Sequence, residues 1–116
     1  MNRLMYVLLL CLFFSSAQAG IGTRTGKVDK VTFHSAVYEP YATDSLGIAF
    51  IHVTGLPGAC TSSSPRVAIG TDHPLYESVV SAALSAQATQ KDVTIQYVDA
   101  CTIRSTAWDF ATFSIN

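Results

Sequence analysis

Positive charge is scarce in this sequence of 116 residues, which carries seven Lys and Arg against eight Asp and Glu. A protein that binds nucleic acid over a broad surface needs an excess of basic residues to neutralise the phosphates. Removal of the leader described below takes Arg3 away and leaves six basic against eight acidic residues, a net charge of −2. We therefore expect no nucleic-acid partner.

Long apolar runs are also missing. The longest, Leu4 to Phe14, covers about 11 residues, whereas a helix needs roughly 20 to cross a bilayer. Arg3 precedes this run, and the small residues of Ala17-Gln18-Ala19 follow it. This is the layout of a secretory signal peptide, with cleavage expected before Gly20. We predict a leader over residues 1–19, one domain over residues 20–116, no membrane span after cleavage, and a secreted or periplasmic location.

Cysteine is equally sparse, with three residues in the whole chain. Cys11 lies in the leader and is expected to leave with it. The remaining pair, Cys60 and Cys101, is predicted to form a disulfide, because an even pair in an exported domain is typically a crosslink. The two cysteines are too far apart in the sequence to match zinc or redox motifs, in which the cysteines are closely spaced.

Catalytic motifs are absent. The chain contains no Gly-x-Ser-x-Gly, no Ser-x-x-Lys and no glycine-rich phosphate loop with its lysine. His34 and His52 lie on segments expected to be neighbouring strands, where Asp29 or Glu39 could complete a metal site, but the spacing does not demand one. A small hydrolase that uses either histidine is the weakest hypothesis. We predict no catalytic residue, no metal and no cofactor.

Alternating apolar residues predict strands over 27–38, 47–54, 66–69, 93–98 and 106–115. A helical pattern covers 74–89, with His73 at its entrance and with Leu75, Val79, Ala82, Ala83 and Ala86 on its apolar face. The strand 47–54 is apolar on both faces, which indicates burial on two sides or a place in a closed barrel. A switch of face near Ala111-Thr112 predicts a bulge. The Gly- and Thr-rich segment 20–26 is predicted to be a flexible arm.

The predicted order of three strands, one helix and two strands describes a mainly β protein with a single helix. A five-stranded OB-type barrel (β-β-β-α-β-β) has this order, with the helix between the third and fourth strands. The alternative is an open α+β sheet with one packed helix.

Aromatic residues in the loop after the first strand are the candidate ligand-binding residues. Tyr38 and Tyr41 flank Pro40, and Asp44 and Ser45 follow. Aromatic rings offer a face to the CH groups of a sugar, while carboxylates and hydroxyls bond to its hydroxyls. The alternative interpretation is ordinary loop packing.

The stretch from Cys60 to Thr102 resembles a known family. Its pieces are a Cys after the second strand, the strand Arg66–Ile69, a helix that ends in Ala82–Ala88, the strand Lys91–Asp99 and a second Cys. This pattern is similar to small exported bacterial proteins related to the B subunits of the subtilase cytotoxin and pertussis-like toxins. The resemblance implies an OB fold, a pentameric assembly and binding of cell-surface glycans, often sialylated.

The toxin subunits bind sugar partly through a serine before the first strand. The corresponding segment, Thr23–Gly26, contains none, so the resemblance assigns no glycan-binding residue. We expect an exported, non-enzymatic binding module, a glycan-binding subunit that resembles toxin B subunits, with a cell-surface glycan as its partner and a homo-oligomeric assembly. The alternative is a periplasmic or secreted protein-interaction factor, an inhibitor or an envelope component, with a protein partner.

Overall fold

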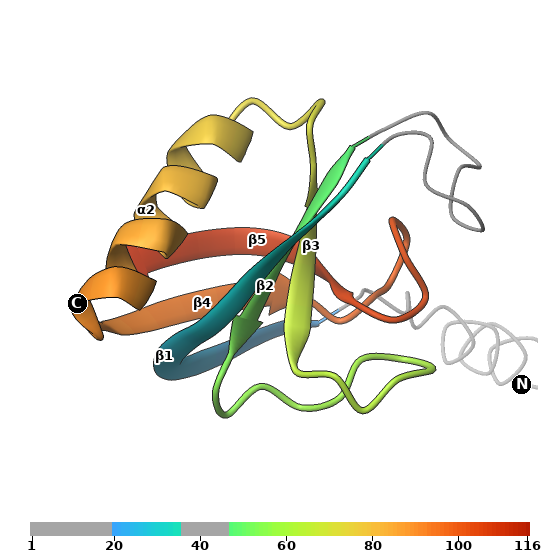
Figure 1. Cartoon of the computed structure of the whole chain (residues 1–116). Coiled ribbons are helices and arrows are strands. Elements are labelled where there is room, and N and C mark those ends of the chain that lie inside the picture. Colours follow the sequence, from blue (N-terminus) through green and yellow to red (C-terminus); the bar gives the residue numbers. More distant parts are fainter. Residues whose placement is uncertain (1–19, 36–46) are drawn as a thin grey trace, which may run out of the picture.

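The computed structural model describes residues 20–35 and 47–116 (Figure 1). Over these residues, the order of three strands, a helix and two strands confirms the sequence prediction of a mainly β fold with one helix. The elements are β1 (Ile21–His34), β2 (Ile48–Val53), β3 (Arg66–Gly70), α2 (Tyr76–Thr89), β4 (Asp92–Val98) and β5 (Trp108–Ile115).

The five strands form one sheet that closes in a ring in the order β1-β2-β3-β5-β4. The long β1 makes this possible, because its first half pairs with β4 and its second half with β2, both antiparallel. The ring closes where β3 and β5 pair in parallel over two residue pairs. The alternative of an open sheet is therefore wrong.

The predicted flexible arm over residues 20–26 is also wrong. Ile21 to Lys27 pair residue by residue with Val98 to Asp92 of β4. Two glycines of this segment allow neighbouring groups to lie close to the β1 backbone. A Cβ on Gly26 would collide with the carbonyl oxygen of Thr54, and a Cβ on Gly22 would collide with the ring of Tyr97.

The main core lies between the inner face of the sheet and α2. All six residues of β2 are buried, as its apolar pattern on both faces predicted. The inward residues of β2 pack with other strands and with the helix, and this cluster includes Ala49, Ile51, Val53, Val67, Ile69, Val79, Ala83 and Ala86. On the outer face of β2, Ile48 and Phe50 form a smaller cluster with Ala68 and Ala107.

Helix α2 begins two residues later than predicted. The Nδ1 of His73 accepts a hydrogen bond from the backbone N–H of Leu75 at 3.0 Å, so His73 lies at the helix entrance as expected. Leu75 precedes the helix and is 50% exposed, so its predicted place on the apolar face is wrong.

The described residues contain no helix with the length and apolar character that crossing a membrane requires.

The bulge predicted near Ala111-Thr112 is confirmed. Gln96 lies opposite Thr112 and Tyr97 opposite Phe110, so Ala111 is the extra residue. A second bulge at Asp29 interrupts the pairing of β1 with β2.

Candidate ligand-binding groove

A groove of about 440 Å³ lies where β1 begins, β4 ends and β5 begins. The connection between β2 and β3 forms its remaining wall. The volume falls within the range of small-molecule sites, about 300–1,000 Å³. The lining residues come from four separate segments: Gly20, Ile21, Gly22, Pro57, Gly58, Tyr97, Asp99 and Trp108.

Two aromatic side chains form one wall of the groove. The ring centroids of Tyr97 and Trp108 are 5.1 Å apart, with 30° between the ring planes. Tyr97 lies opposite Gly22 in the β1–β4 pairing, and its ring occupies the space that a side chain at Gly22 would fill. The missing Cβ at Gly22 therefore sets the position of the Tyr97 ring.

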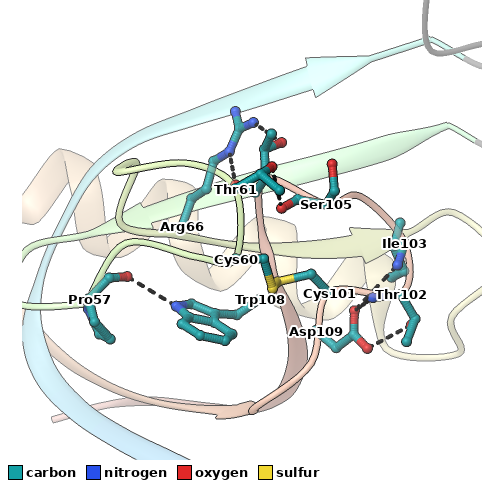
Figure 2. The surroundings of a disulfide bond; sticks show 11 residues. Pro57, Cys60, Thr61, Arg66, Cys101, Thr102, Ile103, Ser105, Trp108 and Asp109 are labelled. Atoms are coloured by element: carbon teal, nitrogen blue, oxygen red, sulfur yellow. Dashed lines mark hydrogen bonds between the residues drawn. A yellow bond between two sulfur atoms is a disulfide. The ribbon is translucent and has the colours of Figure 1, made fainter.

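Trp108 is half-buried, and its indole N–H donates a hydrogen bond to the carbonyl oxygen of Pro57 at 3.0 Å (Figure 2). This bond fixes the ring against the β2–β3 connection. Because the indole N–H is already satisfied, the ring can offer a ligand its apolar surface.

Asp99 is the one charged side chain in the described lining of the groove. It follows β4 and is exposed. Its backbone N–H donates to the carbonyl oxygen of Gly20 at 2.8 Å, which joins the end of β4 to the start of β1. The backbone that carries the carboxylate is therefore held by strand pairing, and the exposed carboxylate can accept hydrogen bonds from a ligand.

The predicted disulfide between Cys60 and Cys101 is confirmed, with a Cα–Cα distance of 6.5 Å. It joins the β2–β3 connection to the turn after β4 (Figure 2). Beside it, the backbone N–H and the Oγ1 of Thr61 donate to the carbonyl oxygen of Ser105 at 3.1 and 3.0 Å. These links hold two of the loops that border the groove.

Arg66 and Asp109 fix the segment that leads into Trp108. Nε of Arg66 donates to the carbonyl oxygen of Thr106 at 3.1 Å, and Nη2 of Arg66 donates to Oγ1 of Thr106 at 2.7 Å. The Arg66 guanidinium also lies 4.1 Å from the Phe50 ring centroid. The carboxylate of Asp109 accepts from the N–H and the hydroxyl of Thr102 at 2.9 and 2.6 Å.

The ligand-binding residues predicted from the sequence, Tyr38, Tyr41, Asp44 and Ser45, lie outside the described residues. Trp108, Tyr97 and Asp99 were not predicted as site residues. The lone tryptophan was the available signal, since Trp is enriched where proteins bind ligands and partners. The other two carried no signal, because only closure of the ring brings them together.

The two strand histidines do not face each other. His34 lies opposite Ile48, whereas His52 lies opposite Lys30. The four-residue offset along β2 separates them by about 13 Å. No group of three or more His, Cys, Asp or Glu side chains within residues 20–35 and 47–116 could hold a metal ion. Glu39, the other carboxylate considered, lies outside these residues.

Both histidines lie in a basic environment. Burial, reinforced by the charges of Arg66 and Arg104, lowers the pKa of His34. His52 is only 7% exposed, and its Nε2 has no hydrogen-bond partner among the described residues. Burial lowers the pKa of His52 to about 4, with Lys30 and Arg66 acting in the same direction and Asp29 opposing them. His52 is therefore neutral at pH 7.

Comparison with known proteins adds no relative to this picture. No family model matches the chain, and searches of curated proteins and of solved structures likewise found no match.

Proposed function

We propose that the closed sheet is a barrel of the OB type. The strand order, the helix between β3 and β4, and the parallel β3–β5 pair that closes the ring support this assignment. The sequence resemblance to the toxin B subunits points the same way.

We propose that the chain is an exported, non-enzymatic module that binds glycans through the groove. The observation that carries the proposal is the joint presence of the Tyr97–Trp108 wall and the Asp99 carboxylate in one groove of sugar-accommodating size. Glycan sites need an apolar ring for the CH face of a sugar and acceptors for its hydroxyls. In this groove Trp108 would stack on the sugar, and Asp99 would accept hydrogen bonds from its hydroxyls.

Export is the second part of the proposal. It rests on the predicted leader, and the disulfide is compatible with an extracytoplasmic location, because disulfides persist in oxidising compartments. With the leader removed, residues 20–116 would act in the periplasm or outside the cell.

A glycan array of the oxidised protein comprising residues 20–116 tests this function, with Asp99→Asn as the site variant. Asp72→Asn is the matched control, because Asp72 is an exposed carboxylate beyond the far end of β3. Binding of a defined sugar class by wild type and Asp72→Asn, with a loss of about tenfold or more in Asp99→Asn, is expected. Failure of the folded wild-type protein to bind any sugar would contradict the proposal.

The alternative function is a secreted or periplasmic factor that binds a protein. Ile21 and Phe33 favour it, since β1 exposes 57% and 52% of these large apolar residues. The mass of the protein in solution separates the two functions further. A homo-oligomer would favour the toxin-like glycan-binding subunit, whereas a monomer that binds no glycan would favour a protein partner.

A further inference from the structure

Gly20 lies at the open rim of the groove. It is exposed and contributes to the lining, and its carbonyl oxygen accepts the hydrogen bond from the Asp99 backbone at 2.8 Å. Apart from its neighbours in sequence, a Cβ built on Gly20 would meet no heavy atom of the described residues within 4 Å, so these residues leave open space around its α-carbon. The α-nitrogen is only two covalent bonds away from the carbonyl carbon whose oxygen Asp99 holds.

The same residue is the predicted first residue of the processed chain. Cleavage before Gly20 would convert its amide nitrogen into a free α-amine. An α-amine has an ordinary pKa of about 7.7–8.0, so it is mostly protonated at neutral pH. The described lining of the groove contains no Lys, Arg or His, and this ammonium would be its one cation.

We propose that removal of residues 1–19 completes the binding groove, because the α-ammonium of Gly20 becomes its cationic hydrogen-bond donor beside Asp99. The inference rests on the proposed function for its ligand class, a hydroxyl-rich sugar. Asp99 accepts hydrogen bonds from hydroxyl groups, the α-ammonium donates to sugar oxygens, and Trp108 supplies an apolar face. A precursor that retains the leader has an uncharged amide at this position.

The backbone accounts for the position of the new charge. The pairs from Ile21↔Val98 to Lys27↔Asp92 hold the first half of β1 against β4, and the Gly20–Asp99 hydrogen bond extends this pairing by one residue. The chain therefore stays ordered up to the predicted cleavage point. An ammonium on an ordered backbone loses less conformational entropy when it binds a ligand than one on a mobile tail.

The first test measures the α-amine directly and needs no sugar. The Gly20 Cα resonance of ¹³C-labelled protein that starts at Gly20 is titrated with pH in wild type, Asp99→Asn and Asp72→Asn. Asp99→Asn is expected to lower the pKa of the α-amine by about 0.2–0.7 pH unit, the range of an exposed ion pair. Asp72→Asn is expected to leave it unchanged. Equal pKa values in all three proteins would overturn the proposal.

The second test uses the glycan array with two forms of the protein, one that starts at Gly20 and one that retains Gln18 and Ala19. The extension moves the amine by two residues, up to about 7 Å. We expect the extended form to bind array glycans at least about tenfold more weakly, as for the loss of a charge-assisted hydrogen bond. Equal binding by the two forms would overturn the proposal. It would also be overturned if the mass of the exported protein showed a first residue other than Gly20.

The two tests together separate this proposal from the proposed function. If Asp99→Asn shifts the α-amine pKa but neither form binds a glycan, the pairing of the N-terminus with Asp99 stands and the glycan-binding function fails.

Discussion

At the scale of the residue, His52 shows how burial converts an ionisable side chain into a pH-dependent weakness. Its pKa is about 4 in the folded protein, against about 6.5 in the unfolded chain. The unfolded chain therefore takes up the proton first as the pH falls, and stability is lost between about pH 6.5 and pH 4. We expect His52 to account for a loss of about 2 kcal/mol between pH 7 and pH 5.

Urea unfolding of wild type and His52→Gln at pH 7 and pH 5 measures this contribution. The absolute stability of the variant is not the readout, because the substitution also changes the packing around a buried side chain. The readout is the difference between the two pH values, which should be smaller in His52→Gln by about 2 kcal/mol. An identical difference in both proteins would show that the His52 imidazole does not govern the acid response.

Gly22 is the residue on which the aromatic wall depends. Gly22→Ala places a methyl group where the Tyr97 ring lies, so the ring must move away from its position against Trp108. We expect a destabilisation of about 1–3 kcal/mol, typical of overpacking, together with a change in Trp fluorescence. Gly20→Ala is the control for stability, because open space surrounds that position. A fluorescence spectrum unchanged by Gly22→Ala would contradict the role given to this glycine.

At the scale of the element, the sequence pattern correctly predicted those features that depend only on residues close together in the chain. The two-faced apolar strand β2, the Val79–Ala83–Ala86 face of α2 and the bulge at Ala111 all follow from the order of neighbouring residues. The first half of β1 does not. Its glycines are disfavoured in strands and interrupt the alternating apolar pattern, and its pairing with β4 joins residues about 70 positions apart. The groove was missed for the same reason, since its four segments meet only after the ring closes.

The disulfide acts on the loop elements at the groove. Its closed loop spans 41 positions, for which the chain-entropy relation predicts a contribution of about 4 kcal/mol. We expect the double variant Cys60→Ala/Cys101→Ala to lose about 2–5 kcal/mol in urea unfolding. Trp108 fluorescence in the folded variant should also change, because the Pro57 carbonyl that holds the indole lies in the β2–β3 connection, which the disulfide joins to the turn after β4. As a control, a thiol reductant should destabilise wild type and leave the stability of the double variant unchanged. A double variant as stable as the oxidised wild-type protein would refute this role of the disulfide.

At the scale of the whole molecule, the closure of the ring depends on its shortest seam. β1 and β4 share seven residue pairs, whereas β3 and β5 share only Val67↔Trp108 and Ala68↔Asp109. A seam this short needs support from outside the ladder. Arg66, the first residue of β3, provides it by donating two hydrogen bonds to Thr106, and the carboxylate of Asp109 holds the Thr102 turn beside β5. The groove depends on this seam, because Trp108, which lines the groove, is one of the two β5 residues that pair with β3.

Asp109→Ala should therefore loosen the closure while the rest of the sheet stays intact. Loss of hydrogen bonds to a charged acceptor weakens local structure by about 1.5–3 kcal/mol, which corresponds to about 10- to 150-fold faster exchange of the seam amides. Hydrogen exchange read by NMR should show this acceleration at residues 67–68 and 108–109, with protection retained along β1–β4. Asp72→Ala, which removes an exposed carboxylate elsewhere, should leave the seam unchanged. Uniform acceleration across all five strands would mean that the ring opens only by global unfolding, and that its closure has no separable weak point.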